Sequence, residues 1–308
     1  MIKKIAYKDK AEWLELRKKM GIGGSDAGAV LGMNPYKSAY TLWAEKTGRL
    51  PEFEGNLITE VGSYLEEFVA RLFVNETGKK VRRENKMLVN TDYDFAFGDV
   101  DRVLIGENAV LEIKTTNSPP AMRKFKNGEY PEQWYCQAVH YMAVGGYEKA
   151  YIAVLINCRE FKIFTIERDE AEIEALMNQE KAFWELVKTQ TPPMADGSES
   201  TRDTLTTIYP DSNGNSVSLM AYEEDLKQYM TFSSLMDDCK NKKEEVANRI
   251  KSYMGEAALG ECNKYKVTWS SSTRSTFDHK KFAEDNPNID LSTYYKTSNY
   301  RTFKVNER

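Results

Sequence analysis

Two carboxylates and a lysine stand at a spacing that suits phosphodiester hydrolysis. Asp101 is followed eleven positions later by Glu112, and Lys114 comes two residues after Glu112. Hydrolysis at neutral pH needs a hard cation, which generates hydroxide and neutralises charge on the phosphate, and hard cations prefer carboxylate oxygens. Asp101 and Glu112 are therefore candidate metal ligands. Lys114 is a candidate for orienting the water or stabilising the developing charge.

A β-hairpin is the element that must bring these three residues together. Apolar residues alternate with a period of two from 81 to 115, which predicts strands over 87–89, 99–105 and 110–115. Residues 106–109 (GENA) form a turn signal between the last two strands. Pairing centred on that turn predicts that Asp101 lies opposite Lys114 and that Glu112 is its diagonal neighbour on the same face.

A third carboxylate is expected from a helix. A helix over 59–76 that stops at Gly78 is predicted by an arc of apolar residues at steps of three and four: Ile58, Val61, Leu65, Phe68, Val69, Leu72 and Phe73. On a helical wheel, Glu66 falls at the edge of the apolar arc and Glu67 on the far side, so Glu66 is the carboxylate that faces inward. Asp and Lys on facing strands often make only a surface ion pair, so the spacing alone leaves both interpretations open.

The remaining elements predict one main domain with an appendage. Short helices fill the first fifty residues, one of them over 38–46, and a helix over 132–144, strands over 150–156 and 161–166 and a helix over 169–188 follow. Residues 189–214 are rich in Pro, Ser, Asp, Asn and Gly, which is typical of a linker. An apolar stripe from Tyr222 to Tyr253 predicts a helix of about nine turns, interpreted as core or subunit packing.

Strand-like residues at 264–269 and 301–305 follow that long helix. We therefore expect a nuclease core over 1–190, a linker over 191–215, and a long helix with a small β appendage over 216–308.

Composition excludes several classes of protein. With 41% hydrophobic and 29% charged residues the chain is typical of a folded globular protein, and no apolar run is long enough to span a membrane. The charged N-terminus does not resemble a signal peptide, so a cytoplasmic location is expected. The net charge of −4 means that a DNA site would have to be a local basic groove. Four cysteines without a CxxC pattern argue against a disulfide framework, a zinc ribbon or an iron–sulfur site.

Three competing motifs are weak. Residues 32–38 resemble a phosphate-binding loop, but Tyr36 stands where the second glycine is required. Residues 21–24 lack the third glycine of a dinucleotide site and are interpreted as a tight turn, with Ser25 or Asp26 capping the next helix. Cys136 and His140 stand four residues apart, yet the chain has only two histidines, so we interpret them as a packed cysteine and a hydrogen-bonded histidine.

The segment from Trp13 to Trp184 resembles the YqaJ-type viral recombinase family, relatives of lambda exonuclease within the PD-(D/E)xK nuclease superfamily. Six sequence words carry the resemblance, in this order: 22–27 (IGGSDA), 42–48 (LWAEKTG), Gly62 with Leu65 and Glu66, Asp101 with Arg102, 111–116 (LEIKTT) and 137–142 (QAVHYM). The resemblance implies an α/β fold of the restriction-endonuclease type, with a mixed central sheet flanked by helices. It also implies a metal-dependent 5′→3′ exonuclease that acts on linear double-stranded DNA.

The resemblance also implies roles for individual residues. The catalytic set is Glu66, Asp101, Glu112 and Lys114, and the metal, Mg²⁺ with Mn²⁺ as a substitute, is held by Asp101, Glu112, Glu66 and the backbone carbonyl of Ile113. Gln137 and Tyr141 match the QxxxY helix of the family, and Arg17 and Ser25 fall where relatives hold the 5′ phosphate of DNA. This chain has Gly98-Asp99-Val100 where the superfamily has a proline before the aspartate, so Asp99 and Asp101 are both candidate ligands.

Relatives also suggest partners. Lambda exonuclease suggests a ring-shaped homo-oligomer, and a single-strand annealing protein is the expected functional partner. Two alternatives stay open. One is an endonuclease or junction-cleaving enzyme with the same metal site, and the other is a non-catalytic DNA-binding module that has kept the fold.

Overall fold

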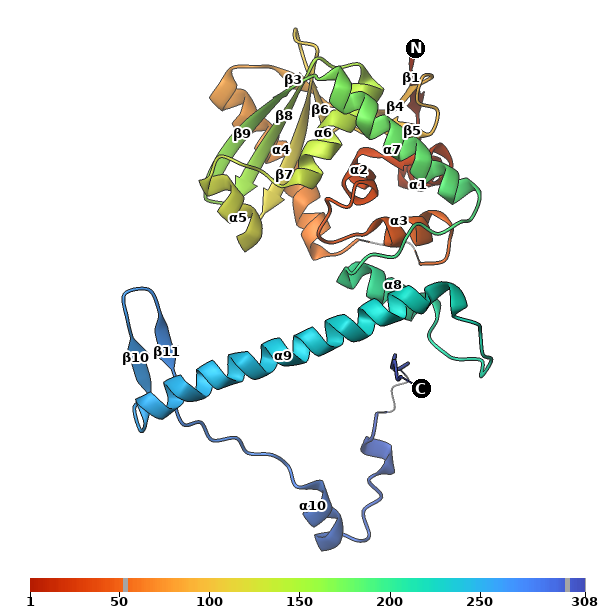
Figure 1. Cartoon of the computed structure of the whole chain (residues 1–308). Coiled ribbons are helices and arrows are strands. Elements are labelled where there is room, and N and C mark those ends of the chain that lie inside the picture. Colours follow the sequence, from red (N-terminus) through yellow and green to blue (C-terminus); the bar gives the residue numbers. More distant parts are fainter. Residues whose placement is uncertain (52–54, 297–299, 308) are drawn as a thin grey trace. The chain divides into compact units, whose positions relative to one another are not determined.

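A mixed five-stranded sheet forms the centre of the first of two compact units (Figure 1). The computed structural model describes residues 1–51, 55–296 and 300–307, and the units are Met1–Tyr209 and Pro210–Arg308. The strand order is β3 (Val81–Arg82), β6 (Arg102–Leu104), β7 (Ala109–Thr116), β8 (Lys149–Ile156) and β9 (Glu160–Glu167). Strands β7 and β8 are parallel, and the other neighbouring pairs are antiparallel.

Helices cover both faces of this sheet. On one face, α4 (Leu57–Thr77) packs Val69 and Phe73 against Leu111 and Ile113 of β7. On the other face, α6 (Glu132–Gly145) and α7 (Glu170–Lys188) form a core with Val110. Because side chains alternate along a strand, the even-numbered residues of β7, which include Glu112 and Lys114, lie on the α6 face.

A smaller sheet and three short helices complete the N-terminal part of this unit. The sheet has the order β1 (Ile2–Ala6), β4 (Lys86–Asn90), β5 (Ala96–Gly98) and β2 (Ile22–Gly23). The helices are α1 (Lys10–Met20), α2 (Gly24–Val30) and α3 (Ala39–Lys46), and a fourth short helix, α5 (Pro119–Lys126), follows β7. Helix α2 lies so close to α6 that a Cβ on Gly24 would be 2.4 Å from the Tyr141 ring and one on Gly28 would be 2.6 Å from Gln133. Glycine at these positions lets the two helices approach.

The second unit is built around one long helix. Helix α9 (Glu223–Met254) follows the 3₁₀ turn η1 (Met220–Tyr222) and leads into the hairpin of β10 (Leu259–Glu261) and β11 (Lys266–Thr268). Helix α10 (His279–Asp285) and the 3₁₀ turn η2 (Ser292–Tyr294) come next, and the ring of Phe303 lies 5.6 Å from that of Tyr229 in an edge-on contact.

The predicted mixed sheet flanked by helices, with an appended long helix, is confirmed, and several details differ. Within the first fifty residues, where only short helices were expected, β1 and β2 are strands of the smaller sheet. The strand expected over 99–105 is limited to β6, and 301–305 contains no strand. The segment expected as a linker holds α8 (Glu199–Ile208), where the Thr204 hydroxyl lies 2.8 Å from that of Thr41. On α4, three residues of the expected inward arc are exposed: Ile58, Val61 and Phe68. Within the described ranges, no helix is both long and apolar enough to cross a membrane.

Candidate functional site

The hairpin of β6 and β7 brings Asp101 next to Glu112. Arg102 pairs with Leu111 and Val103 with Val110, so continuing the register by one residue places Asp101 opposite Glu112. The prediction that Asp101 lies opposite Lys114 is wrong by two residues, because the turn spans 105–108 instead of 106–109. A shift of two residues leaves every side chain on its predicted face, since the side-chain period of a strand is two.

Asp101 and Glu112 form an acidic pair, in which Glu112 is buried and Asp101 is partly buried. Oδ2 of Asp101 accepts a hydrogen bond from the N–H of Ile113 at 2.7 Å. Oε2 of Glu112 is buried and has no hydrogen-bond partner among the described residues. Burial and the charge of Glu112 raise the pKa of Asp101 well above its usual value, and burial raises the pKa of Glu112 despite the nearby Lys114 ammonium. The single ammonium of Lys114 therefore does not fully compensate the two carboxylates.

A hydrogen-bonded chain runs from Glu112 to helix α6. Oε1 of Glu112 accepts from Nζ of Lys114 and from Nε2 of Gln137, both at 2.7 Å. Lys114 also donates to Oε1 of Gln137 at 2.8 Å, and Nε2 of Gln137 donates to the hydroxyl of Tyr141 at 3.1 Å. Tyr141 in turn donates to the carbonyl of Asp99 at 2.8 Å. The structure thus brings the predicted residues Glu112, Lys114, Gln137 and Tyr141 together.

Glu66 reaches the same region through Arg102, a residue that sequence reasoning did not single out. The buried guanidinium of Arg102 donates to a carboxylate oxygen of Glu66, to Oε2 of Glu67 at 3.0 Å and to the carbonyl of Asp101 at 2.7 Å. Its only signal in the sequence was its place beside Asp101 in one of the six words. Glu66 is therefore ion-paired, and in the described part of the chain no three acidic, His or Cys side chains are gathered around one point.

The carboxylate of Asp99 is held by helix α1. Nε1 of Trp13 donates to Oδ2 of Asp99 at 2.6 Å, and a guanidinium nitrogen of Arg17 lies 3.7 Å from the same oxygen. Burial raises the pKa of Asp99. Asp101, by contrast, bonds to the backbone of β7. This geometry favours Asp101 over Asp99 as the partner of Glu112.

Arg17 and Ser25 also lie close together. Nη2 of Arg17 is 3.4 Å from Oγ of Ser25, and the guanidinium carbon is 4.6 Å from the centre of the Trp13 ring and 5.4 Å from that of Phe97. Ser25 is an exposed residue in the first turn of α2. The structure thus assembles the two residues that the resemblance linked to a 5′ phosphate.

Helix α2 begins differently from the prediction. Its N-cap is Gly23 and not Ser25 or Asp26. Oδ2 of Asp26 accepts from the N–H of Gly23 at 3.1 Å and lies 2.8 Å from Nζ of Lys46. Burial alone would raise the pKa of Asp26, but Lys46 and Arg17 lower it to about 2. Sequence reasoning missed this ion pair, although both residues lie within the six words.

His140 and Cys136 have the roles that the sequence predicted. Both ring nitrogens of the fully buried His140 are engaged, Nδ1 with Oε1 of Glu180 at 2.8 Å and Nε2 with the carbonyl of Phe97 at 2.9 Å. Sγ of the buried Cys136 lies 3.5 Å from Sδ of Met33. His140 on α6 therefore forms hydrogen bonds to α7 and to β5, the strand that precedes Asp99.

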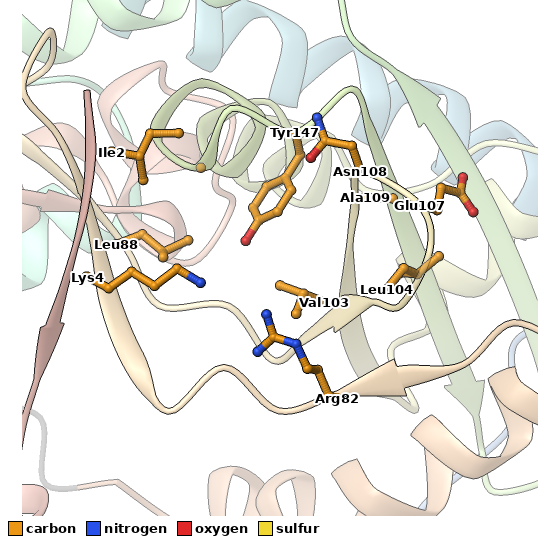
Figure 2. Close-up of a pocket in the computed structure, with 11 residues that line it drawn as sticks. Ile2, Lys4, Arg82, Leu88, Val103, Leu104, Glu107, Asn108, Ala109 and Tyr147 are labelled. Atoms are coloured by element: carbon orange, nitrogen blue, oxygen red, sulfur yellow. The ribbon is translucent and has the colours of Figure 1, made fainter.

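A separate hollow lies at the other end of β7. It has a volume of about 390 Å³ and is lined by Lys4, Arg82, Ala109 and Tyr147, with Ile2 and Leu88 on its apolar wall (Figure 2). The buried carboxylate of Glu84 contacts both Lys4 and Arg82, the latter at 3.4 Å, so these cations are already paired. None of the predicted catalytic residues lines this hollow, and the candidate site is the cluster around Asp101 and Glu112.

Comparison with known proteins gives one family. The family described as "YqaJ-like viral recombinase domain" matches residues 12–148. The "Uncharacterized protein YqaJ" of Bacillus subtilis (strain 168) is 35% identical over 302 residues, which cover 96% of this chain and 94% of that protein.

A solved structure is similar to part of this chain. An alkaline exonuclease from Laribacter hongkongensis aligns with a TM-score of 0.51 at 19% identity, over 59% of this chain and 94% of its own. This likeness shows the fold, and the restriction-endonuclease-like class expected from the sequence is confirmed.

Proposed function

The chain belongs to the YqaJ-like viral recombinase family, and we propose that it is a divalent-cation-dependent deoxyribonuclease that hydrolyses phosphodiester bonds in double-stranded DNA. One observation carries the proposal. Glu112 has a buried carboxylate oxygen without a hydrogen-bond partner in the described residues, and this carboxylate is next to the partly buried carboxylate of Asp101. Two neighbouring carboxylates with only the Lys114 ammonium beside them are costly to bury, and a hard cation offsets that cost.

The side chains present fit such a cation. Asp101 and Glu112 are expected to hold it together with the backbone carbonyl of Ile113, and Mg²⁺, with Mn²⁺ as a substitute, is the cation that suits an all-oxygen set. Glu66 would join as a further ligand or through water once its carboxylate leaves Arg102. When bound, the cation supplies a lower pKa for a water molecule and neutralises charge on the scissile phosphate.

The protein's own groups would do the rest of the chemistry. Lys114 has its ammonium 2.7 Å from Glu112 and 2.8 Å from Gln137, so it is held beside the acidic pair and can donate to an attacking water or to a phosphate oxygen that gains charge. The chain of Gln137 and Tyr141 fixes the position of that ammonium. We expect Lys114 to act in the transition state and the chain on α6 to keep it in place.

Digestion would proceed from a DNA end in the 5′→3′ direction. Arg17 and Ser25 supply a guanidinium and a hydroxyl within 3.4 Å of one another, and Trp13 holds the guanidinium from one side. A terminal phosphate carries more negative charge than an internal diester, so this pair would favour a 5′-phosphorylated end. Such an enzyme prepares single strands for recombination, with a single-strand annealing protein as its partner, and a homo-oligomeric ring as in lambda exonuclease would keep it on the strand.

The proposal is tested by comparing two forms of one plasmid. Linear duplex and covalently closed circular duplex are incubated with the full chain in Mg²⁺ or in EDTA. We expect the linear form to be lost in Mg²⁺ but not in EDTA, and the closed circle to persist in both. Nicking of the circle would show an endonuclease or junction-cleaving enzyme, and loss of neither form, with DNA bound, would show a non-catalytic module and overturn the proposal.

A further inference from the structure

Helix α9 presents a long apolar stripe that its own unit leaves exposed. The helix has 32 residues, about 48 Å at 1.5 Å per residue, and none of them is buried. Tyr229, Val246, Ile250 and Tyr253 of the stripe are 44%, 45%, 42% and 94% exposed. The Phe303 ring contacts the stripe at Tyr229. A helix gains most of its stability in water by packing an apolar face, so this stripe is expected to have a partner.

The charges of α9 are divided between its two halves. Residues 223–238 contain five acidic residues and one basic residue, a net charge of −4, while 239–254 contain five basic and two acidic residues, a net charge of +3. The helix dipole favours acidic residues in the first turn and basic residues in the last. It does not account for Asp237, Asp238, Lys240, Lys242 and Lys243, which lie in the middle. The separation of acidic and basic residues between the two halves of α9 therefore needs another explanation than the helix dipole.

We propose that α9 is a self-association surface, on which α9 of a second copy of this chain packs antiparallel. In that arrangement the acidic half of each helix faces the basic half of the other, whereas a parallel pair would place like charges together. The contact would be two-fold symmetric, so each copy uses the same surface.

One antiparallel alignment satisfies the apolar stripe and the charges together. Placing Leu226 opposite Tyr253 also places Tyr229 opposite Ile250, and the two-fold axis then passes between Cys239 and Lys240. The same alignment sets Asp237 opposite Lys242 of the second copy. Stripe and charges thus agree on one register. This inference concerns the second unit and does not depend on the nuclease proposal.

Charge reversal tests the pairing. One variant of the full chain carries Asp237→Lys and Asp238→Lys, a second carries Lys240→Glu and Lys242→Glu, and a third carries all four changes. Sedimentation equilibrium measures the dissociation constant of self-association. We expect each two-residue variant to associate more weakly, on the order of tenfold. The four-residue variant should recover, because positions 237 and 242, which face each other beside the two-fold axis, again carry opposite charges.

Two results would overturn the proposal. The first is a wild-type chain that is monomeric at roughly 50 µM, where an interface of micromolar Kd would be mostly occupied. The stripe would then be covered by this chain itself or by another protein. The second is a four-residue variant that stays as weak as the two-residue variants.

Cross-linking tests the orientation independently of the number of copies in the assembly. With the exposed Cys158, Cys239 and Cys262 replaced by Ser, one chain receives Gln228→Cys and another Ser252→Cys, and the two are mixed with a short bis-maleimide. Antiparallel packing predicts cross-links that join position 228 of one chain to position 252 of the other. Cross-links joining 228 to 228 and 252 to 252 would show a parallel pair and contradict the proposal. Thr207→Cys, at an exposed position on α8, is the control for random collision.

Discussion

Nζ of Lys114 lies 2.7 Å from Oε1 of Glu112, two residues away on the same strand, while Oε2 of that carboxylate has no hydrogen-bond partner in the part of the chain that the structure describes. One oxygen is thus neutralised by the protein and the other is free for a cation. In the proposed reaction Glu112 therefore binds the cation, and Lys114 stabilises the transition state.

Removing the Lys114 ammonium is expected to slow the chemical step. Lys114→Met should lower kcat and kcat/KM together by about 100- to 1000-fold, because a group that acts only in the transition state contributes equally to both. Steady-state digestion of linear duplex measures this. Lys149→Met, on the neighbouring strand and paired with Glu167, should leave the rates unchanged. An unchanged kcat with a raised KM in Lys114→Met would assign the residue to phosphate binding instead.

Loss of the Arg102 guanidinium is expected to destabilise the fold as well as the site. Arg102→Met leaves the carbonyl of Asp101 and the partly exposed Glu66 without their buried partner and should lower the free energy of unfolding by about 1.5–3 kcal/mol. Arg83 bonds to the same Glu67 at 3.2 Å but is 55% exposed, so Arg83→Met should cost less than about 1 kcal/mol. Urea denaturation compares the two, and equal losses would refute the buried role of Arg102.

Stability should depend on pH through His140. Burial alone would lower its pKa, but the Glu180 carboxylate and the Phe97 carbonyl raise it above the usual value, and burial raises the pKa of Glu180 as well. A group with a raised pKa binds more protons in the folded state. Its stabilisation is therefore complete below the unfolded pKa, about 6.5 for histidine, and is lost as pH rises through the folded pKa.

Glu180→Gln isolates this effect. The Tm of the wild type should fall as pH rises above about 6.5, and the fall should be smaller in Glu180→Gln, which no longer stabilises the imidazolium. Glu185→Gln removes a carboxylate from the same helix that is 54% exposed and should keep the wild-type slope. The same slope in all three proteins would show that His140 is not the titrating group.

The 5′ phosphate prediction concerns Arg17. Identical linear duplexes with a 5′ phosphate or a 5′ hydroxyl are digested by the wild type, by Arg17→Ala and, as control, by Arg123→Ala on helix α5. The wild type should prefer the phosphate, and the preference should shrink in Arg17→Ala alone, because the guanidinium near Ser25 recognises the extra charge. Equal wild-type rates on both ends would rule this role out, whatever the variants did.

Local patterns in the sequence were sufficient for the elements and for part of the site. The alternation of apolar residues placed Glu112 and Lys114 on one strand face, and the four-residue spacing of Gln137 and Tyr141 placed them on one helix face. Both depend only on the period of a single element. The register of β6 and β7 could not be fixed in this way, because a shift of two residues preserves the alternating pattern and only the turn decides between the two pairings.

Contacts between distant segments could not be predicted. His140 and Glu180 are forty residues apart in the sequence, and Arg102 and Glu66 are thirty-six residues apart. Neither pair leaves a periodic signal, because its burial results from the packing of two helices and a sheet. The same holds for Lys46 and Asp26, whose ion pair fixes the start of α2.

The most direct test of the metal site is single-turnover hydrolysis of a linear 5′-phosphorylated duplex across a Mg²⁺ titration. Wild type, Asp101→Asn, Glu112→Gln and Asp99→Asn are compared, with duplex binding measured in parallel. The wild-type rate should saturate with Mg²⁺ and vanish in EDTA. Asp101→Asn and Glu112→Gln should lose on the order of 1000-fold in rate while still binding DNA, and Asp99→Asn, whose carboxylate is held by Trp13, should keep most activity. Near-normal hydrolysis by Glu112→Gln, or loss of activity in Asp99→Asn with Asp101→Asn active, would contradict the proposed site.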